Sequence, residues 1–122
     1  MPNENFKEIF KKRLYNFVIK LVKTLDKLPK DSVNRIFIDQ LIRSSSSILA
    51  NYIEAQAASS RKDFTNFIHH SLKSANESKV WVSFLKDIGR LSQTEADYFL
   101  QELKEISNIL AKSILTLKSK SS

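Results

Sequence analysis

Apolar side chains recur every three or four residues through most of the chain, which is the period of an amphipathic α-helix and not of a strand. The pattern breaks at Leu28-Pro29, at a pair of serines at 59 and 60, and at Gly89. Proline disfavours helix in the residue before it, and glycine is favoured just after a helix ends. The pattern therefore predicts four helices, at about 4–27, 33–58, 60–88 and 93–118.

Polar residues suited to capping stand where three of these helices begin. They are Asp31 or Ser32, Ser59 or Ser60, and Ser92 with Glu95 three residues on, which is a capping-box pattern. Helices of about 25 residues would be about 37 Å long, and short connections force neighbours to run antiparallel. We expect an all-α fold, an antiparallel up-down-up-down four-helix bundle that forms one domain over residues 1–122.

Composition narrows the class of protein further. The 122 residues include one Gly, two Pro and no Cys, which disfavours hairpin-rich β folds and excludes disulfides, thiolate chemistry and Cys-ligated metals. The hydrophobic fraction of 42% is enough for a core. Neither a membrane-spanning run nor a signal peptide is visible, so we expect a soluble cytoplasmic protein with no membrane partner.

Positive charge gathers on the first predicted helix. The net charge is +7, and residues 1–30 carry eight bases against three acids. On a helical wheel, five bases share an arc about 100° wide that contains no acid. The arc is either a solvated face or a ridge that contacts phosphates, since interspersed acids would cancel its field. Its bases are Lys12, Arg13, Lys20, Lys23 and Lys27, and we expect Arg61 and Lys62 to assist them.

The second predicted helix has an unusual polar stripe opposite its apolar rows. Four consecutive serines lie in mid-helix, where serine is an indifferent helix former. Small hydroxylated side chains permit close approach of another helix, so the stripe is interpreted as a subunit interface, against solvated surface or an active-site groove. The predicted interface residues are Gln40, Arg43, Ser44, Ser47, Asn51 and Glu54.

Two segments resemble a known family. Gln40-Leu41-Ile42-Arg43-Ser44, followed by Ser47 and Ala50-Asn51-Tyr52-Ile53-Glu54-Ala55, resembles a signature of bacterial four-helix-bundle proteins encoded in intervening sequences of large-subunit (23S) ribosomal RNA genes. The segment from Ser71 to Trp81 is similar to the third-helix segment of that family. Ala55 stands where Gly is common, and Ser74 replaces an acidic residue.

The resemblance implies a homo-oligomer, typically a ring of five, and kinship to accessory variability proteins of diversity-generating retroelements. Those are similar basic bundles that bind nucleic acid and a reverse transcriptase. Residue by residue, it assigns Arg43, Ser44, Ser47, Asn51 and Glu54 to helix packing and subunit contact before chemistry.

Catalytic and metal-binding patterns are weak in this sequence. A di-iron bundle needs Glu-x-x-His pairs, and neither His69 nor His70 has Glu three residues before it. No strand–turn–helix elbow or Gly-rich loop is visible. Some four-helix ribonucleases of toxin–antitoxin systems carry an Arg and a His with four to six residues between them, whereas seven residues lie between Arg61 and His69 and eight between Arg61 and His70. We expect no metal, no cofactor and no enzymatic activity.

The sequence thus favours a non-enzymatic, oligomeric four-helix bundle that binds nucleic acid, with RNA preferred over DNA. A protein-interaction scaffold that docks an acidic partner such as a reverse transcriptase is the alternative, and a four-helix ribonuclease is the third.

Overall fold

Four helices make up the chain, in the number and order that the sequence predicts. The computed structural model describes the backbone of residues 2–121 and the side chains of residues 5–117. No strand occurs within residues 2–121, which confirms the all-α class. The helix ends differ from the predicted ones by three residues at most. The helices are α1 (Pro2–Leu25), α2 (Ser32–Gln56), α3 (Arg61–Asp87) and α4 (Gln93–Ser121).

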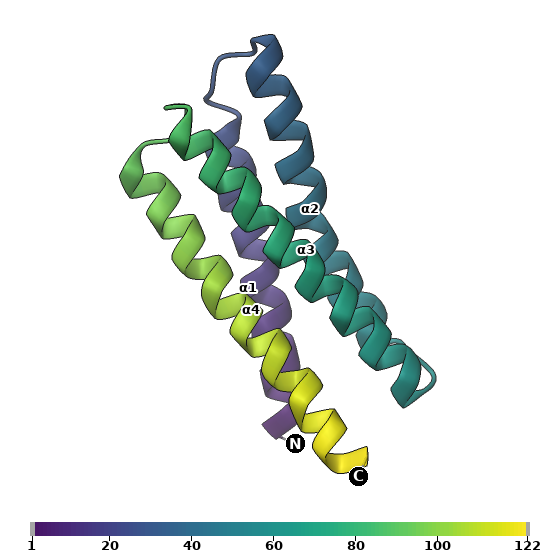
Figure 1. Ribbon diagram of the computed structural model, residues 1–122. Coiled ribbons are helices and arrows are strands. Elements are labelled where there is room, and N and C mark those ends of the chain that lie inside the picture. Colours follow the sequence, from purple (N-terminus) through teal and green to yellow (C-terminus); the bar gives the residue numbers. More distant parts are fainter. Residues whose placement is uncertain (1, 122) are drawn as a thin grey trace.

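Successive helices run antiparallel, as the short connections require (Figure 1). Both termini lie at one end of the bundle together with the α2–α3 turn, and the other two turns lie at the opposite end (Figure 1). Each helix packs on the next in sequence. α1 also meets α4, where the Phe17 and Phe99 rings make an edge contact at 5.9 Å between centroids. The up-down-up-down four-helix bundle is therefore confirmed.

The predicted caps hold the helix ends. Asp31 accepts a hydrogen bond from the backbone N–H of Asn34 at 2.8 Å, and Ser60 accepts one from Asp63 at 3.1 Å. Ser92 and Glu95 bond reciprocally through side chain and backbone, at 3.1 and 3.3 Å. These contacts satisfy backbone N–H groups that a helix start leaves without partners. Gly89 has φ +79°, a conformation in which glycine avoids the strain of a side chain.

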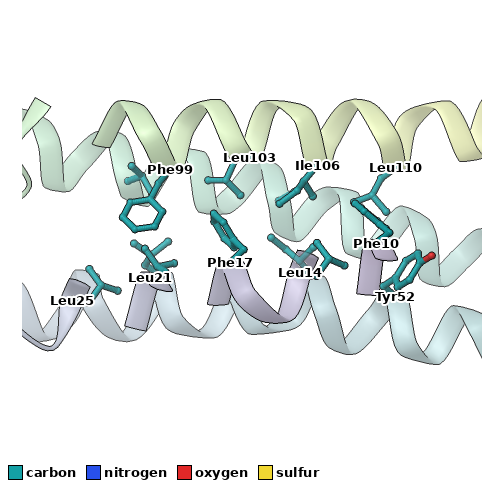
Figure 2. Packing of buried hydrophobic residues seen from close by; sticks show 14 of the residues in the cluster. Phe10, Leu14, Phe17, Leu21, Leu25, Tyr52, Phe99, Leu103, Ile106 and Leu110 are labelled. Atoms are coloured by element: carbon teal, nitrogen blue, oxygen red, sulfur yellow. The ribbon is translucent and has the colours of Figure 1, made fainter. Parts of the chain in front are cut away.

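A single core runs the length of the bundle, and it determines which side of α1 faces water. Rows of large apolar side chains from α1 and α4 interdigitate in layers, and Tyr52 of α2 closes one end against Phe10 (Figure 2). Because the core takes one side of α1, the residues at intervening positions are left in solvent. The buried α1 row is Phe10, Leu14, Phe17, Leu21 and Leu25, and the α4 row is Phe99, Leu103, Ile106 and Leu110.

Candidate nucleic-acid interface

The solvent side of α1 and the turn that follows it carry four exposed lysines, which we call the α1 basic face: Lys12, Lys20 and Lys23 on the helix, and Lys27 in the turn. None of them forms an ion pair with any side chain among residues 5–117. The two nearby acids of α1 and its following turn are engaged elsewhere, because Lys11 pairs with Glu8 at 3.2 Å and Lys30 with Asp26 at 3.1 Å. The face is therefore a row of positive charge that no close carboxylate neutralises.

Arg13 was predicted to contact phosphates, and the structure shows it engaged with two acids of α4. Its guanidinium donates to both carboxylate oxygens of Glu102 at 2.7 and 2.8 Å and to Glu105 at 2.9 Å. Hydrogen bonds to Glu102 raise the pKa of Arg13 further above its ordinary value, while Gln101 and Arg13 lower the pKa of Glu105. A bidentate pair of this kind is strong and directional, so Arg13 joins α1 to α4 instead of facing solvent. The acids belong to another helix, which is why a wheel of α1 alone misses them.

Lys20 has a partner that the sequence analysis did not foresee. Its Nζ lies 3.7 Å from the centroid of the Tyr98 ring on α4, within the range of a cation–π contact. Tyr98 remains 47% exposed and Tyr15 is 56% exposed. The basic face is thus bordered by two exposed aromatic rings, one from α4 and one from α1 itself.

Two open grooves run along either side of α1. Ile9, Lys12 and Asn16 line both of them, so these residues form the crest that separates the grooves. Tyr15 lies in the groove toward α2, and Tyr98 in the groove toward α4. The first groove is also lined by Glu8, Lys11, Leu49 and Ile53, and the second by Arg13, Phe17, Lys20 and Glu102.

Arg61 and Lys62 are not brought together with the middle and far end of the α1 basic face. Both are exposed at the start of α3, at the end of the bundle where α1 begins (Figure 1). Lys23 and Lys27 lie toward the opposite end, and α3 packs on α2 and α4. A ligand on the α1 basic face of one chain therefore extends to these two residues only by passing around the end of the bundle.

The serine-rich side of α2 packs on α3 within the same chain, although its residues were predicted to form a contact between chains. Ser44 is 4% exposed, and its hydroxyl lies 2.8 Å from that of Ser78. Ser74 donates to Ser47 at 3.1 Å, and Asn51 donates to the Ser47 carbonyl at 2.9 Å. The close approach that small side chains permit is thus to α3, and the Ser44 side chain is buried between the two helices.

The outer part of the same stripe stays accessible. Arg43 and Glu54 are exposed, while Gln40, Ser47 and Asn51 are partly buried. Exposed Ile36 continues the stripe toward the start of α2 at helical spacing. It borders a cluster in which Phe37 stacks on Phe84 at 5.4 Å. This α2–α3 face combines apolar and charged groups, which is typical of protein contact surfaces.

The candidate metal-binding and catalytic residues of the sequence, His69, His70 and Arg61, all lie on α3. Among the described residues no three His, Cys, Asp or Glu side chains gather as a metal would require. His69 and His70 are both exposed on α3, and so is Arg61. In a helix, His69 and His70 point about 100° apart, so they do not converge on one ion or one substrate atom.

None of the helices within the described residues combines the length and the apolar character that crossing a bilayer requires.

Comparison with known proteins agrees with this geometry. The sequence model of the 23S rRNA-intervening sequence protein family matches residues 7–112. A solved structure from Bacteroides thetaiotaomicron VPI-5482, a protein of unknown function from the S23 ribosomal protein family, is 28% identical in sequence. It superposes with a TM-score of 0.82 over 88% of this chain and 96% of that chain. No curated protein matches. The family match spans all four helices, and the chain belongs to the 23S rRNA-intervening sequence protein family.

Proposed function

We propose that this protein is a non-enzymatic, oligomeric four-helix bundle that binds nucleic acid, with RNA preferred, through the α1 basic face. One observation carries the proposal: three exposed lysines on one side of α1 and a fourth in the turn after it have no ion-pair partner among residues 5–117, while the neighbouring acids Glu8 and Asp26 are bound to other lysines. A polyanion gains from such a row because each phosphate contact releases a condensed counterion.

Rigidity of α1 supports the same role. The Arg13 bridge to Glu102 and Glu105 and the Phe17–Phe99 contact fix α1 on α4. The lysines therefore project from a scaffold that does not have to be ordered when ligand binds, which lowers the entropic cost of association.

Assembly would multiply the basic faces in one particle. The α2–α3 face, which carries exposed Arg43 and Glu54 and, toward the start of α2, the stacked Phe37 and Phe84 rings, is the surface we assign to contact between copies. Several linked sites raise avidity without any new contact. Light scattering should give a mass several times 14.1 kDa, and Arg43→Glu should shift it to smaller species. A monomer in the unmodified protein would end this part of the proposal.

Binding is tested by fluorescence anisotropy with labelled RNA and DNA over a series of salt concentrations. Each lysine that contacts a phosphate adds about one unit to the slope of log K against log salt. Lys23→Gln with Lys27→Gln should weaken binding and lower the slope by about two. The matched control, Lys73→Gln with Lys104→Gln, removes the same charge from exposed sites on α3 and α4. Equal losses in both variants would show only a response to net charge.

A second candidate function is a scaffold that docks an acidic protein, such as a reverse transcriptase. The groove between α1 and α2 favours this scaffold function, because exposed Ile53 and partly buried Leu49 lie beside Lys12 there. Capture of a partner from lysate separates the two functions, since a protein partner survives nuclease treatment and a nucleic-acid tether does not.

A further inference from the structure

The groove between α1 and α2 contains an aromatic ring that the core does not use. Tyr15 is 56% exposed, and among residues 5–117 it has neither a ring partner nor a hydrogen bond. Leu49 and Ile53 of α2 supply an apolar surface in the same groove, and Ile53 is itself 44% exposed. The groove is thus open, largely apolar and equipped with one accessible π face.

The polar groups around this ring match the parts of a nucleotide. Lys12 and Asn16 stand on the crest beside Tyr15, and neither has a partner among the described side chains. An amide offers both a donor and acceptors, as the edge of a base requires, and an ammonium binds phosphate. A flat base needs an aromatic or apolar face on which to stack.

Charge gives the site a direction. At one end of the groove Lys11 is already paired with Glu8. Beyond Lys12, the solvent side of α1 continues with Lys20 and Lys23, and Lys27 follows in the next turn; none of these lysines pairs with a carboxylate of residues 5–117. The phosphate backbone is therefore favoured along the crest, and bases are favoured on the side toward α2.

We propose that this groove takes an unstacked base of a single-stranded nucleic acid, with Tyr15 as the stacking platform and Asn16 at the base edge, while the α1 lysines hold the backbone. The inference rests on the proposed function and deepens it by naming the class of polyanion. A duplex keeps its bases stacked inside, so it reaches the lysines and leaves Tyr15 unused. The other ring, Tyr98, already has Lys20 over one face, which leaves Tyr15 as the open platform.

The test compares three labelled ligands by anisotropy: an oligouridine strand, an abasic strand of equal length and charge, and an RNA duplex. Stacking is worth about 1–3 kcal/mol per base, so Tyr15→Leu should weaken oligouridine binding about 5- to 150-fold. Abasic and duplex affinities should not change, and the salt slope should stay the same for all three. Tyr15→Phe should restore oligouridine binding. Phe6→Leu, which removes another exposed aromatic ring of α1 that lines neither groove, is the matched control and should change nothing.

The outcomes separate this inference from the function beneath it. If the wild-type protein binds oligouridine and the abasic strand equally well, bases are not read and the inference is overturned, whereas the polyanion function stands. The same holds if Tyr15→Leu weakens both strands alike. If no ligand binds at low salt, the proposed function fails and this inference falls with it. The comparison of strands on the wild-type protein decides the matter even if Tyr15→Leu does not fold.

Discussion

The two long sides of α2 are packed in opposite ways. Toward α3, small side chains bring the backbones so close that the Ser71 hydroxyl donates to the Ile48 carbonyl at 2.7 Å. Toward α1, large side chains such as Tyr52 against Phe10 hold the helices further apart, and an open groove remains at the outer edge. The tight seam leaves little for a ligand to contact, whereas the looser one exposes an aromatic ring and lysines.

Hydroxyl groups make the tight seam possible without disrupting the helices. Ser44 and Ser45 each lie near a carbonyl of their own helix, at 3.3 and 3.2 Å, and Ser78 donates to the Ser74 carbonyl at 2.9 Å. Their polarity is satisfied locally, so they can be buried between the helices at small cost. α2 and α3 therefore form the tightly packed pair of helices in the bundle, and α1 is the helix whose looser packing on α2 leaves room for a ligand.

The largest effect should come from removing volume on the α1 side. Leu21 is fully buried in the core row, so Leu21→Ala leaves a cavity and should lower the free energy of unfolding by about 2–5 kcal/mol. Urea denaturation followed by circular dichroism measures it. A loss under 1 kcal/mol would mean that α1 adds little to the core, which would contradict the packing in Figure 2.

The tight seam should show the opposite sensitivity, to added volume. Ser78 is buried against Ser44, so Ser78→Leu must push α2 and α3 apart and should cost about 1–3 kcal/mol. Ser78→Ala removes only the hydroxyl and should cost about 1 kcal/mol. Both are measured by urea denaturation. If leucine were tolerated better than alanine, the helices would not be in close contact here, and the contrast between the two sides of α2 would collapse.

The four helices and their caps were predictable because each depends on neighbours in sequence. The core period, Pro29, Gly89 and the Ser92–Glu95 pair all act within a few residues, and all of them hold in the structure. Which surfaces remain exposed depends on contacts between segments that are distant in the sequence, so the sequence pattern alone did not predict them. On a helical wheel Arg13 lies in the same arc as four lysines. Only the position of Glu102 on α4, 89 residues further along the chain, shows that Arg13 is paired.

The same reasoning explains the serine stripe. The sequence correctly indicated that small hydroxylated residues admit a close neighbour, but it could not say which helix approaches. Ser71, Ser74 and Ser78 on α3 repeat at helical spacing and offered a signal, since they supply a matching small row. Tyr15 and Tyr98 were missed because exposure of a ring depends on packing that a single helix does not reveal.

A smaller effect is expected at the bridge that fixes α1 to α4. Both partners are partly exposed, so Arg13→Met should cost about 1 kcal/mol in low salt and less in high salt. Because Gln101 and Arg13 lower the pKa of Glu105, that carboxylate stabilises the fold above its ordinary pKa of 4.5 and loses this effect as the pH falls below it. Melting temperatures of wild type and Arg13→Met should therefore converge in acid. A constant difference from neutral to acid pH would contradict the ion-pair role.

The smallest predicted effect concerns Lys20, which contacts Tyr98 of α4 and also belongs to the α1 basic face. Lys20 lies over the Tyr98 ring, so Lys20→Met should lower the free energy of unfolding by about 0.5–1 kcal/mol, since an exposed cation–π contact is worth that much. Lys23→Met removes the same charge from an exposed position on the same helix face and should cost less. Equal costs would show that the contact with Tyr98 adds no stability.

In binding assays both variants should lower the slope of log K against log salt by about one. A phosphate competes with the Tyr98 ring for the Lys20 ammonium, and the release of counterions favours the phosphate. If the salt slope is unchanged in Lys20→Met alone, Lys20 stays in contact with the Tyr98 ring when ligand is bound, and the basic face acts through Lys12, Lys23 and Lys27.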